Sequence, residues 1–479
     1  IILLCDVNEI IYGELIMDNQ NTDMRQDGLG HPCCIFRRRR YYIAIMACIG
    51  YVVSYSTRVN LSVAIIFITK GFNVTESNAT TTKKEFMWDE NVQGIILASF
   101  FYGYIITQIP GGYLAGIIGG NHVLNLGVAG SGLISFVGPA CLKFSVGASI
   151  AMRVICGLFQ GVTVPAISSM WARWAPPLER TILSTIAISG NFFSSIIIMP
   201  ICSVIGDYLG WEWMFYIFGA LSLAWSVAWS FTVFAGPEKD IFIKESELQY
   251  IQTSIGERTD SQPKHPWKRI FSSMPVGAAV VAQTGHNWGY YTMLLHGPKY
   301  YHETLKINLQ LSSFYTGLCF TVTGFLMQVF GQISDFLRRT KHMKTVSVRK
   351  MFCCGGFLAQ SIFMILLIFN RNPYFCVAFS ILAIGMGGIT WSAFNVNPLD
   401  IAAPHAAIIS GLANTCATLS GIFAPMVSAW YISGRNSVHI EDWMGVWIIC
   451  VIIYFLSAIF FLLFAAGEKQ SWVYTANEN

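Results

Sequence analysis

The chain has 479 residues, of which 54% are hydrophobic and only 12% are charged, and its formal net charge is +4. Because a soluble domain carries about 25% charged residues, these values exclude an ordinary soluble protein and indicate many membrane spans. The basic residues lie in short clusters between apolar runs, which argues against nucleic-acid binding.

Twelve segments have the length and apolar character of membrane-spanning helices, which need about 20 mostly apolar residues. We therefore predict an all-α membrane protein. In the first half of the chain the predicted helices cover residues 41–68, 92–118, 122–142, 146–174, 182–205 and 213–234. In the second half they cover residues 276–295, 309–330, 351–369, 374–394, 406–431 and 444–464.

The order of these segments predicts five regions. They are a disordered cytosolic N-terminus (1–36), a six-helix bundle (37–236), a charged cytosolic linker (237–273), a second six-helix bundle (274–467) and a cytosolic tail (468–479). Short glycine-led turns, GGYLAGIIGGNH and GQISDFLRRTKH, follow the second helix of each half. Two related halves of this kind are typical of secondary transporters.

The basic clusters also predict how the chain is oriented. They precede the first helix, follow the fourth and the eighth, and lie in the linker, which places all of them on one side of the membrane. Short loops rich in Lys and Arg face the cytosol, so we expect both termini there. Two glycosylation sequons, at Asn73 and Asn78, fall on the opposite side and are predicted to carry glycans.

Two arginines, Arg58 and Arg153, lie within predicted spans at similar depth. An arginine at the centre of a membrane helix costs about 2.5 kcal/mol or more. Each shares a helical face with polar or small residues, and no Asp or Glu lies deep inside any predicted span. We therefore expect the two guanidinium groups to bind a carboxylate or phosphate substrate. The alternative is that each reaches the surface or binds backbone carbonyls.

Other polar residues complete the candidate site. His286 and Tyr290 share a face of the seventh helix, where His286 would bind substrate or carry a coupling proton, or serve only a structural role. Asn60 and Gln160 are further candidates for substrate binding. On the cytosolic side we expect salt bridges that stabilise one access state, or else solvated loop charges, at Glu179, Arg180, Asp335 and Arg338.

Several stretches resemble the solute carrier 17 family, which holds the sialins, the vesicular glutamate transporters and the type I sodium–phosphate cotransporters. They are RVNLSVAI, SFFYGYIITQIPGGYLA, GVTVPA, WAPPLER and FNVNPLDIA. The resemblance implies a major facilitator fold of two six-helix bundles with alternating access. It also implies that Arg58 and Arg153 correspond to the two arginines on which organic-anion transport in the family depends.

The chain departs from that family at informative positions. Gln160 replaces a glutamate implicated in proton coupling, and His286 and Leu97 replace the arginine and histidine of the vesicular glutamate transporters. These differences argue against glutamate transport and against sialin-type proton coupling, because an amide does not exchange a proton.

We conclude from the sequence that the chain is a secondary active transporter of inorganic phosphate or a small organic anion. Na⁺, a proton or the membrane potential would drive it, without a metal or other cofactor. We expect a monomer in the plasma membrane or in a lysosomal or vesicular membrane. The alternatives are a sialin-like proton-coupled exporter of sialic acid or acidic sugars, and an anion channel in the same fold. An enzyme is not expected, because no His/Asp/Glu cluster or nucleophile motif is evident.

Overall fold

The computed structural model describes residues 38–69, 72–76, 79–83, 88, 90–255, 266–340, 342–432 and 439–474. The predicted N-terminal region 1–36 and the sequon residue Asn78 lie outside the described residues. Most described residues are helical, as predicted. The structure also has one short antiparallel hairpin that the all-α prediction does not include, formed by β1 (Phe72–Glu76) and β2 (Ala79–Lys83). Asn73 lies in β1, opposite Thr82.

The first half of the chain forms the helices expected from its hydropathy. They are α2 (Arg39–Thr69), α3 (Glu90–Ile118), α4 (Gly120–Phe144), α5 (Val146–Gly161), α6 (Thr163–Trp174), α7 (Arg180–Tyr208) and α8 (Trp211–Thr232). Helices α5 and α6 together make the predicted span 146–174, interrupted at Val162. Pro165 lies in the first turn of α6, where a missing backbone N–H leaves no helical hydrogen bond unmade.

The second half repeats this pattern. Its elements are α11 (Met274–Lys299), η3 (Tyr300–Thr304), α12 (Leu309–Arg339), α13 (Thr345–Phe369), α14 (Pro373–Gly385), α15 (Gly387–Phe394), α16 (Asn397–Ala402), η4 (Ala403–His405), α17 (Ala406–Ile432) and α18 (Ile440–Phe464). The linker contains η2 (Pro237–Lys239), α9 (Glu245–Ile255) and α10 (Trp267–Ser272), and the tail contains α19 (Ser471–Tyr474).

Helices α12 and α13 extend beyond the predicted ranges 309–330 and 351–369. Prediction from hydropathy stops at the first charged residues, whereas the helical hydrogen bonds continue to Arg339 and begin again at Thr345. The charged residues between the predicted spans therefore lie mostly on helical turns. Such turns hold side chains in fixed directions, which a solvated loop would not do.

By length and composition, ten helical stretches of the described residues are suited to crossing a membrane. One of them, the 60-residue stretch Pro373–Ile432, contains both α14–α15 and α17. Helix α11, which carries Gln283, His286 and Asn287, is not among the ten. It completes the twelve spans that the sequence predicts.

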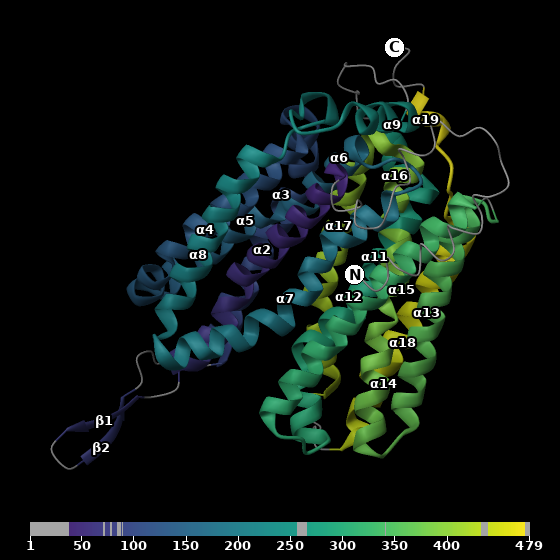
Figure 1. Cartoon of the computed structure of the whole chain (residues 1–479). Helices are drawn as coiled ribbons and strands as arrows, with labels where there is room; N and C mark the ends of the chain where they lie inside the picture. Colours follow the sequence, from purple (N-terminus) through teal and green to yellow (C-terminus); the bar gives the residue numbers. More distant parts are fainter. Residues whose placement is uncertain are drawn as a thin grey trace.

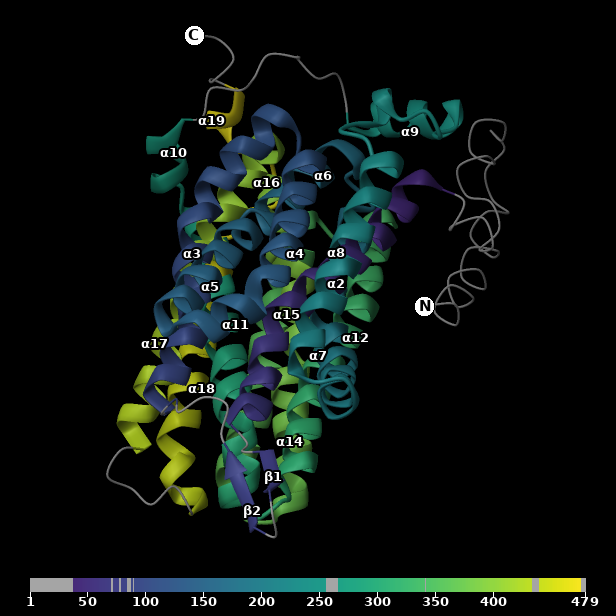
Figure 2. The same cartoon turned by 90° about the vertical axis from the view of Figure 1, so that its left-hand side faces the viewer.

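The two halves form two bundles, α2–α8 and α11–α18, which lie side by side (Figure 1). Their ribbons converge near α6, α9 and α16 and diverge toward the end that carries β1 and β2. The view turned by 90° places α9, α10 and α19 at the first end, with α10 and α19 on one side and α9 on the other (Figure 2). We call this end the linker face and the opposite end the hairpin face.

Candidate functional site

Arg58 and Arg153 meet in the first bundle. The Nη1 of Arg153, on α5, donates a hydrogen bond to the backbone oxygen of Arg58, on α2, at 3.3 Å. Arg153 is 4% exposed, whereas Arg58 is only partly buried. The two spans therefore bring the arginines together at one depth, as residue counting predicts. The backbone contact of Arg153 is also one of the alternatives that the sequence left open.

Aromatic rings surround the two guanidinium groups. The Arg58 guanidinium carbon lies 4.7 Å from the ring centroid of Phe100, 4.9 Å from Phe101 and 5.5 Å from Tyr104. The guanidinium carbon of Arg153 lies 5.1 Å from the same Phe100 ring. A ring face attracts a cation, so these side chains offset part of the cost of burying the arginines without neutralising them.

Neither arginine forms an ion pair with a carboxylate in the described part of the chain. The Nε of Arg153 is buried and has no acceptor among these residues. Tyr291 of α11, in the second bundle, approaches the aromatic group around Arg58, because its ring contacts the Phe101 ring at 5.8 Å between centroids. Arg58 therefore lies where the two bundles meet, and its charge is uncompensated.

The structure separates His286 from Tyr290, although both lie on α11. The Tyr290 ring contacts Phe192 of the first bundle at 6.1 Å between centroids. His286 is 2% exposed and packs at 5.7 Å against Trp391, which itself contacts Phe192 at 5.8 Å. Tyr290 therefore faces the other bundle, and His286 lies behind Trp391. Both His286 ring nitrogens lack partners among the described residues.

Gln160 joins two helices of the first bundle. Its amide donates to the backbone oxygen of Ser54 at 3.0 Å and to the hydroxyl of Thr57 at 2.8 Å, so it ties α5 to α2. Asn60 is fully buried, and its side-chain oxygen accepts from its neighbour's backbone N–H. Two residues correspond to about 200° around a helix, so Asn60 points away from Arg58. The structure does not bring Asn60 to the arginine pair.

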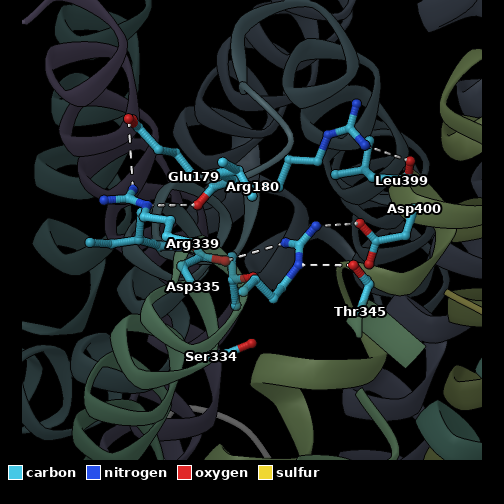
Figure 3. A network of polar contacts seen from close by, with 12 residues as sticks. Glu179, Arg180, Ser334, Asp335, Arg339, Thr345, Leu399 and Asp400 are labelled. Carbon is cyan, nitrogen blue, oxygen red and sulfur yellow. Dashed lines mark hydrogen bonds and ion pairs between the residues drawn. The ribbon is translucent and has the colours of Figure 1, made fainter. Parts of the chain in front are cut away.

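Glu179 is the centre of a charged cluster on the linker face. It accepts two hydrogen bonds from Arg40, at 2.7 and 3.1 Å, and Arg40 also binds Glu247 of α9 at 2.8 Å. Arg339 of the second bundle lies 3.7 Å away (Figure 3). Burial alone would raise the pKa of the Glu179 carboxyl, but attraction to Arg40 and Arg339 outweighs burial and lowers that pKa below its usual value.

Deeper on the linker face, α12 contacts the start of α7. The carboxylate of Asp335 accepts a hydrogen bond from the backbone N–H of Ile182 at 2.8 Å. A carboxylate at this place satisfies a free N–H and interacts favourably with the helix dipole. Arg338 contacts Asp335 at 3.4 Å and Asp400 at 3.6 Å. The predicted gating residue Asp335 therefore joins the two bundles directly.

The next contacts connect Arg180 and Thr181, at the start of α7, with Leu399 and Asp400 of α16. Arg180 donates to the backbone oxygen of Leu399 at 2.9 Å (Figure 3). Arg349 binds Asp400 at 2.8 Å and the hydroxyl of Thr181 at 3.0 Å. We call these contacts, with those of Asp335 and Arg338, the polar seam. Together they connect the start of α7 to α12, α13 and α16.

Sequence reasoning missed Arg349 and Asp400 as partners, and it also missed Arg40 and Glu247. Arg40 and Arg349 fall in basic clusters, Asp400 falls near the end of a predicted span, and Glu247 falls in the charged linker. Arg349 and Asp400 are 51 residues apart, and no local spacing signals their pairing. Complementary charges at the ends of neighbouring spans are the only signal in the sequence.

A second contact between the bundles is made by backbone rather than charge. A Cβ atom added to Gly112 of α3 would lie 2.7 Å from the backbone oxygen of Ala407. A Cβ added to Gly411 of α17 would lie 2.6 Å from the backbone oxygen of Gln108. We call this contact the glycine seam. One turn deeper, the side-chain amide of Asn414 donates to the Tyr104 hydroxyl at 3.1 Å.

Comparisons with known proteins agree with this architecture. The Major Facilitator Superfamily model matches residues 47–425. Human sialin is 37% identical over 457 residues, covering 92% of this chain and 91% of sialin. Vesicular glutamate transporter 1 of Xenopus laevis is 34% identical over 445 residues, covering 92% of this chain and 77% of that protein. The transporter FucP, solved in the outward conformation, has a TM-score of 0.62 at 14% identity and covers 88% of this chain and 99% of FucP.

Proposed function

The chain belongs to the Major Facilitator Superfamily, and on this premise we propose that it is a secondary active transporter of anions that works by alternating access. The predicted twelve-helix major facilitator fold and the resemblance to the solute carrier 17 family are both confirmed. The matched relatives are named as transporters of glutamate or as sialin. Transport of an anion by this chain is our own inference from its residues.

The observation that carries the proposal is the arginine pair. Arg58 and Arg153 are held in the membrane by α2 and α5, and no described carboxylate pairs with either. Removing such charges from water costs several kcal/mol per ion. An anion bound at the exposed edge of Arg58 would offset that desolvation cost. Tyr291 and Tyr290 would contact the same anion from the second bundle, and His286 would act from behind Trp391.

The substrate classes that fit are inorganic phosphate and small organic anions. Overall identity of 37% to human sialin favours a sialin-like acidic sugar as the second candidate. Gln160 is an amide fixed to Ser54 and Thr57, so it supplies no exchangeable proton for symport. Coupling to Na⁺ or to the membrane potential therefore ranks before coupling to a proton, and a channel in the same fold remains the alternative to a carrier.

Alternation would open and close the two faces in turn. Contacts of Glu179, Arg180 and Asp335 join the two bundles at the linker face, and Arg338 contacts Asp335 and Asp400 within the second bundle. We propose that these contacts stabilise the state that is open toward the hairpin face. The linker face would be cytosolic, with both termini, and glycans would be attached at Asn73 and Asn78 on the other side. The protein would act as a monomer.

Uptake into proteoliposomes tests the proposal. We expect saturable uptake of phosphate or sialic acid, but not glutamate, under an imposed sodium, proton or voltage gradient. Arg58→Ala should abolish uptake while insertion into the membrane is unchanged. Arg371→Ala is the matched control, because Arg371 is an exposed arginine paired with Glu441 outside the site. Normal uptake by Arg58→Ala would refute the role of the pair, and flux that neither saturates nor shows counterflow would indicate a channel.

A further inference from the structure

A hollow of about 500 Å³ lies between the linker and the tail, at the linker face. Its polar lining comes from both segments. The linker supplies Arg269, Ser272 and Ser273, and the tail supplies Gln470, Ser471 and Trp472. The view turned by 90° shows α10 and α19 on the same side of this face (Figure 2). Neither the arginine pair nor the polar seam uses these residues, so the hollow is not part of the site already described.

The walls of the hollow are held by packing against the second bundle. The backbone N–H of Gln470 donates to the backbone oxygen of Ile401, in α16, at 3.0 Å. Trp472 and Val473 are 9% and 8% exposed, and they belong to one apolar cluster with Ile270 of α10. Linker and tail are therefore both fixed here, and so is the shape of the hollow between them.

The polar groups of the hollow suit a phosphate. None of the described residues that line it is an Asp or a Glu. Ser272 already donates its hydroxyl hydrogen to the backbone oxygen of Lys268, at 2.8 Å. The groups that can donate to a ligand therefore include the guanidinium of Arg269 and the hydroxyls of Ser273 and Ser471. Hydrogen bonds from a guanidinium to a phosphate are charge-assisted and frequently bidentate, so Arg269 supplies both charge and direction.

Three exposed apolar side chains lie beside this polar lining. Trp267 and Phe271 of α10 are 38% and 60% exposed, and their rings stack at 6.2 Å between centroids. Met274, the first residue of α11, is 56% exposed. Exposed aromatic side chains at the end of a membrane span are typical of the boundary between lipid tails and headgroups. The hollow therefore lies at the level of the headgroups, with apolar neighbours that can contact lipid tails.

A polar hollow with an apolar border fits a lipid better than a soluble ion. We propose that the hollow binds the phosphate headgroup of an anionic membrane phospholipid, with Arg269 as its main contact. Its volume of about 500 Å³ lies within the range of small-molecule sites and admits a whole headgroup. The exposed Lys268 adds a positive charge nearby. Anionic lipids give the cytoplasmic leaflet its negative charge, so the inference rests on the orientation proposed above.

The bound lipid would hold the tail on the second bundle. Arg269 belongs to the linker and Ser471 to the tail, so one headgroup would bridge the two segments. A spin label at the exposed Lys469→Cys reports on the tail. We expect the label to become less mobile when an anionic phospholipid is added, and not when a zwitterionic one is added.

Native mass spectrometry of the purified full-length protein in detergent tests the site, with phosphatidylinositol compared with phosphatidylcholine. We expect one phosphatidylinositol to be retained in preference, and Arg269→Gln to weaken its binding about fivefold. Lys239→Gln removes an exposed charge from the same face, on the first bundle, and should change nothing. Ser471→Asp places a carboxylate in the hollow and should prevent binding, whereas Ser471→Asn, of similar size, should keep it.

The source of the phosphate is tested separately. Trp267→Ser combined with Phe271→Ser should weaken lipid retention, and soluble glycerophosphoinositol at the same concentration should not displace the lipid. Equal retention of both lipids, undiminished retention in both Arg269→Gln and Ser471→Asp, or displacement by the soluble headgroup would each overturn the proposal. Arg58→Ala should retain the lipid in full, so failure of the lipid site is distinguishable from failure of the transport site.

Discussion

The polar seam and the glycine seam occupy equivalent places in the two halves of the molecule. In each, the second helix of one half packs on the fifth helix of the other: α12 on α7, and α3 on α17. The first is held by charges at Asp335 and Arg349, and the second by backbone contact at Gly112 and Gly411. The halves thus share an architecture but have diverged in how the seam is held.

The difference begins in two short segments of sequence. GQISDFLRRTKH, after the second helix of the second half, carries Asp335 and Arg338 of the polar seam, whereas GGYLAGIIGGNH, after the second helix of the first half, has no Asp, Glu, Lys or Arg. Charges attract over several ångströms and respond to ions. Backbone contact requires close approach and responds only to shape. The polar seam should therefore respond to ions and protons, and the glycine seam to side-chain volume.

Of the predicted changes, removal of one carboxylate from the polar seam should lower stability the most. Asp400→Asn leaves Arg349 and Arg338 without their shared partner. Losing one member of a buried pair costs about 3–5 kcal/mol, so we expect a large fall in thermal stability. The distance between labels at Lys239→Cys and Lys344→Cys, measured in the presence and absence of the substitution, should show the linker face opening.

Two comparisons sharpen that result. Glu441→Gln removes one partner of the exposed Arg371 pair and should cost less than about 1 kcal/mol. Combining Asp400→Asn with Arg349→Met removes the orphaned charge and should recover part of the stability. A double variant as unstable as Asp400→Asn alone would show that the unpaired arginine is not the cause.

Added volume should break the glycine seam. Gly112→Val would place a Cβ atom 2.7 Å from the backbone oxygen of Ala407, which is too close. Helices α3 and α17 must therefore separate. Overpacking of this kind costs about 1–3 kcal/mol, and the closed linker face should lose population by about 5- to 150-fold. Gly116→Val, one turn along α3 where nothing lies within 4 Å, is the control. Equal label distances in both variants would contradict the close-packing account.

The sequence predicts the fold and the arginine pair for identifiable reasons. Hydropathy locates the spans, and residue counting places Arg58 and Arg153 at one depth, where the structure joins them. It does not predict the polar seam, because Arg349 and Asp400 are far apart in the chain and each resembles a solvated end charge. Nor does helical spacing reveal that Trp391 lies between His286 and the first bundle, since that depends on packing within the second bundle.

A single hydroxyl should have a smaller effect on the glycine seam. Tyr104→Phe removes the acceptor for the Asn414 amide, which crosses between the bundles one turn deeper. A hydrogen bond contributes about 1 kcal/mol, so the closed state should weaken about fivefold, measured by the same label distance. Tyr102→Phe, at a 53% exposed position of α3, should change nothing. A comparable effect of both substitutions would mean that the hydroxyl does not bridge the bundles.

The smallest effect concerns pH and the charged cluster around Glu179. Arg40 and Arg339 lower the pKa of this carboxyl below its ordinary value of 4.5. A lowered pKa means that the stabilisation is complete above the ordinary value and is lost only as the pH falls through the folded-state pKa. The difference in thermal midpoint between wild type and Glu179→Gln should therefore be constant from about pH 8 to pH 5 and shrink only below about pH 4.5. A difference that already shrinks between pH 7 and pH 5 would mean that the carboxyl titrates near neutrality, and the arginines would then not control it.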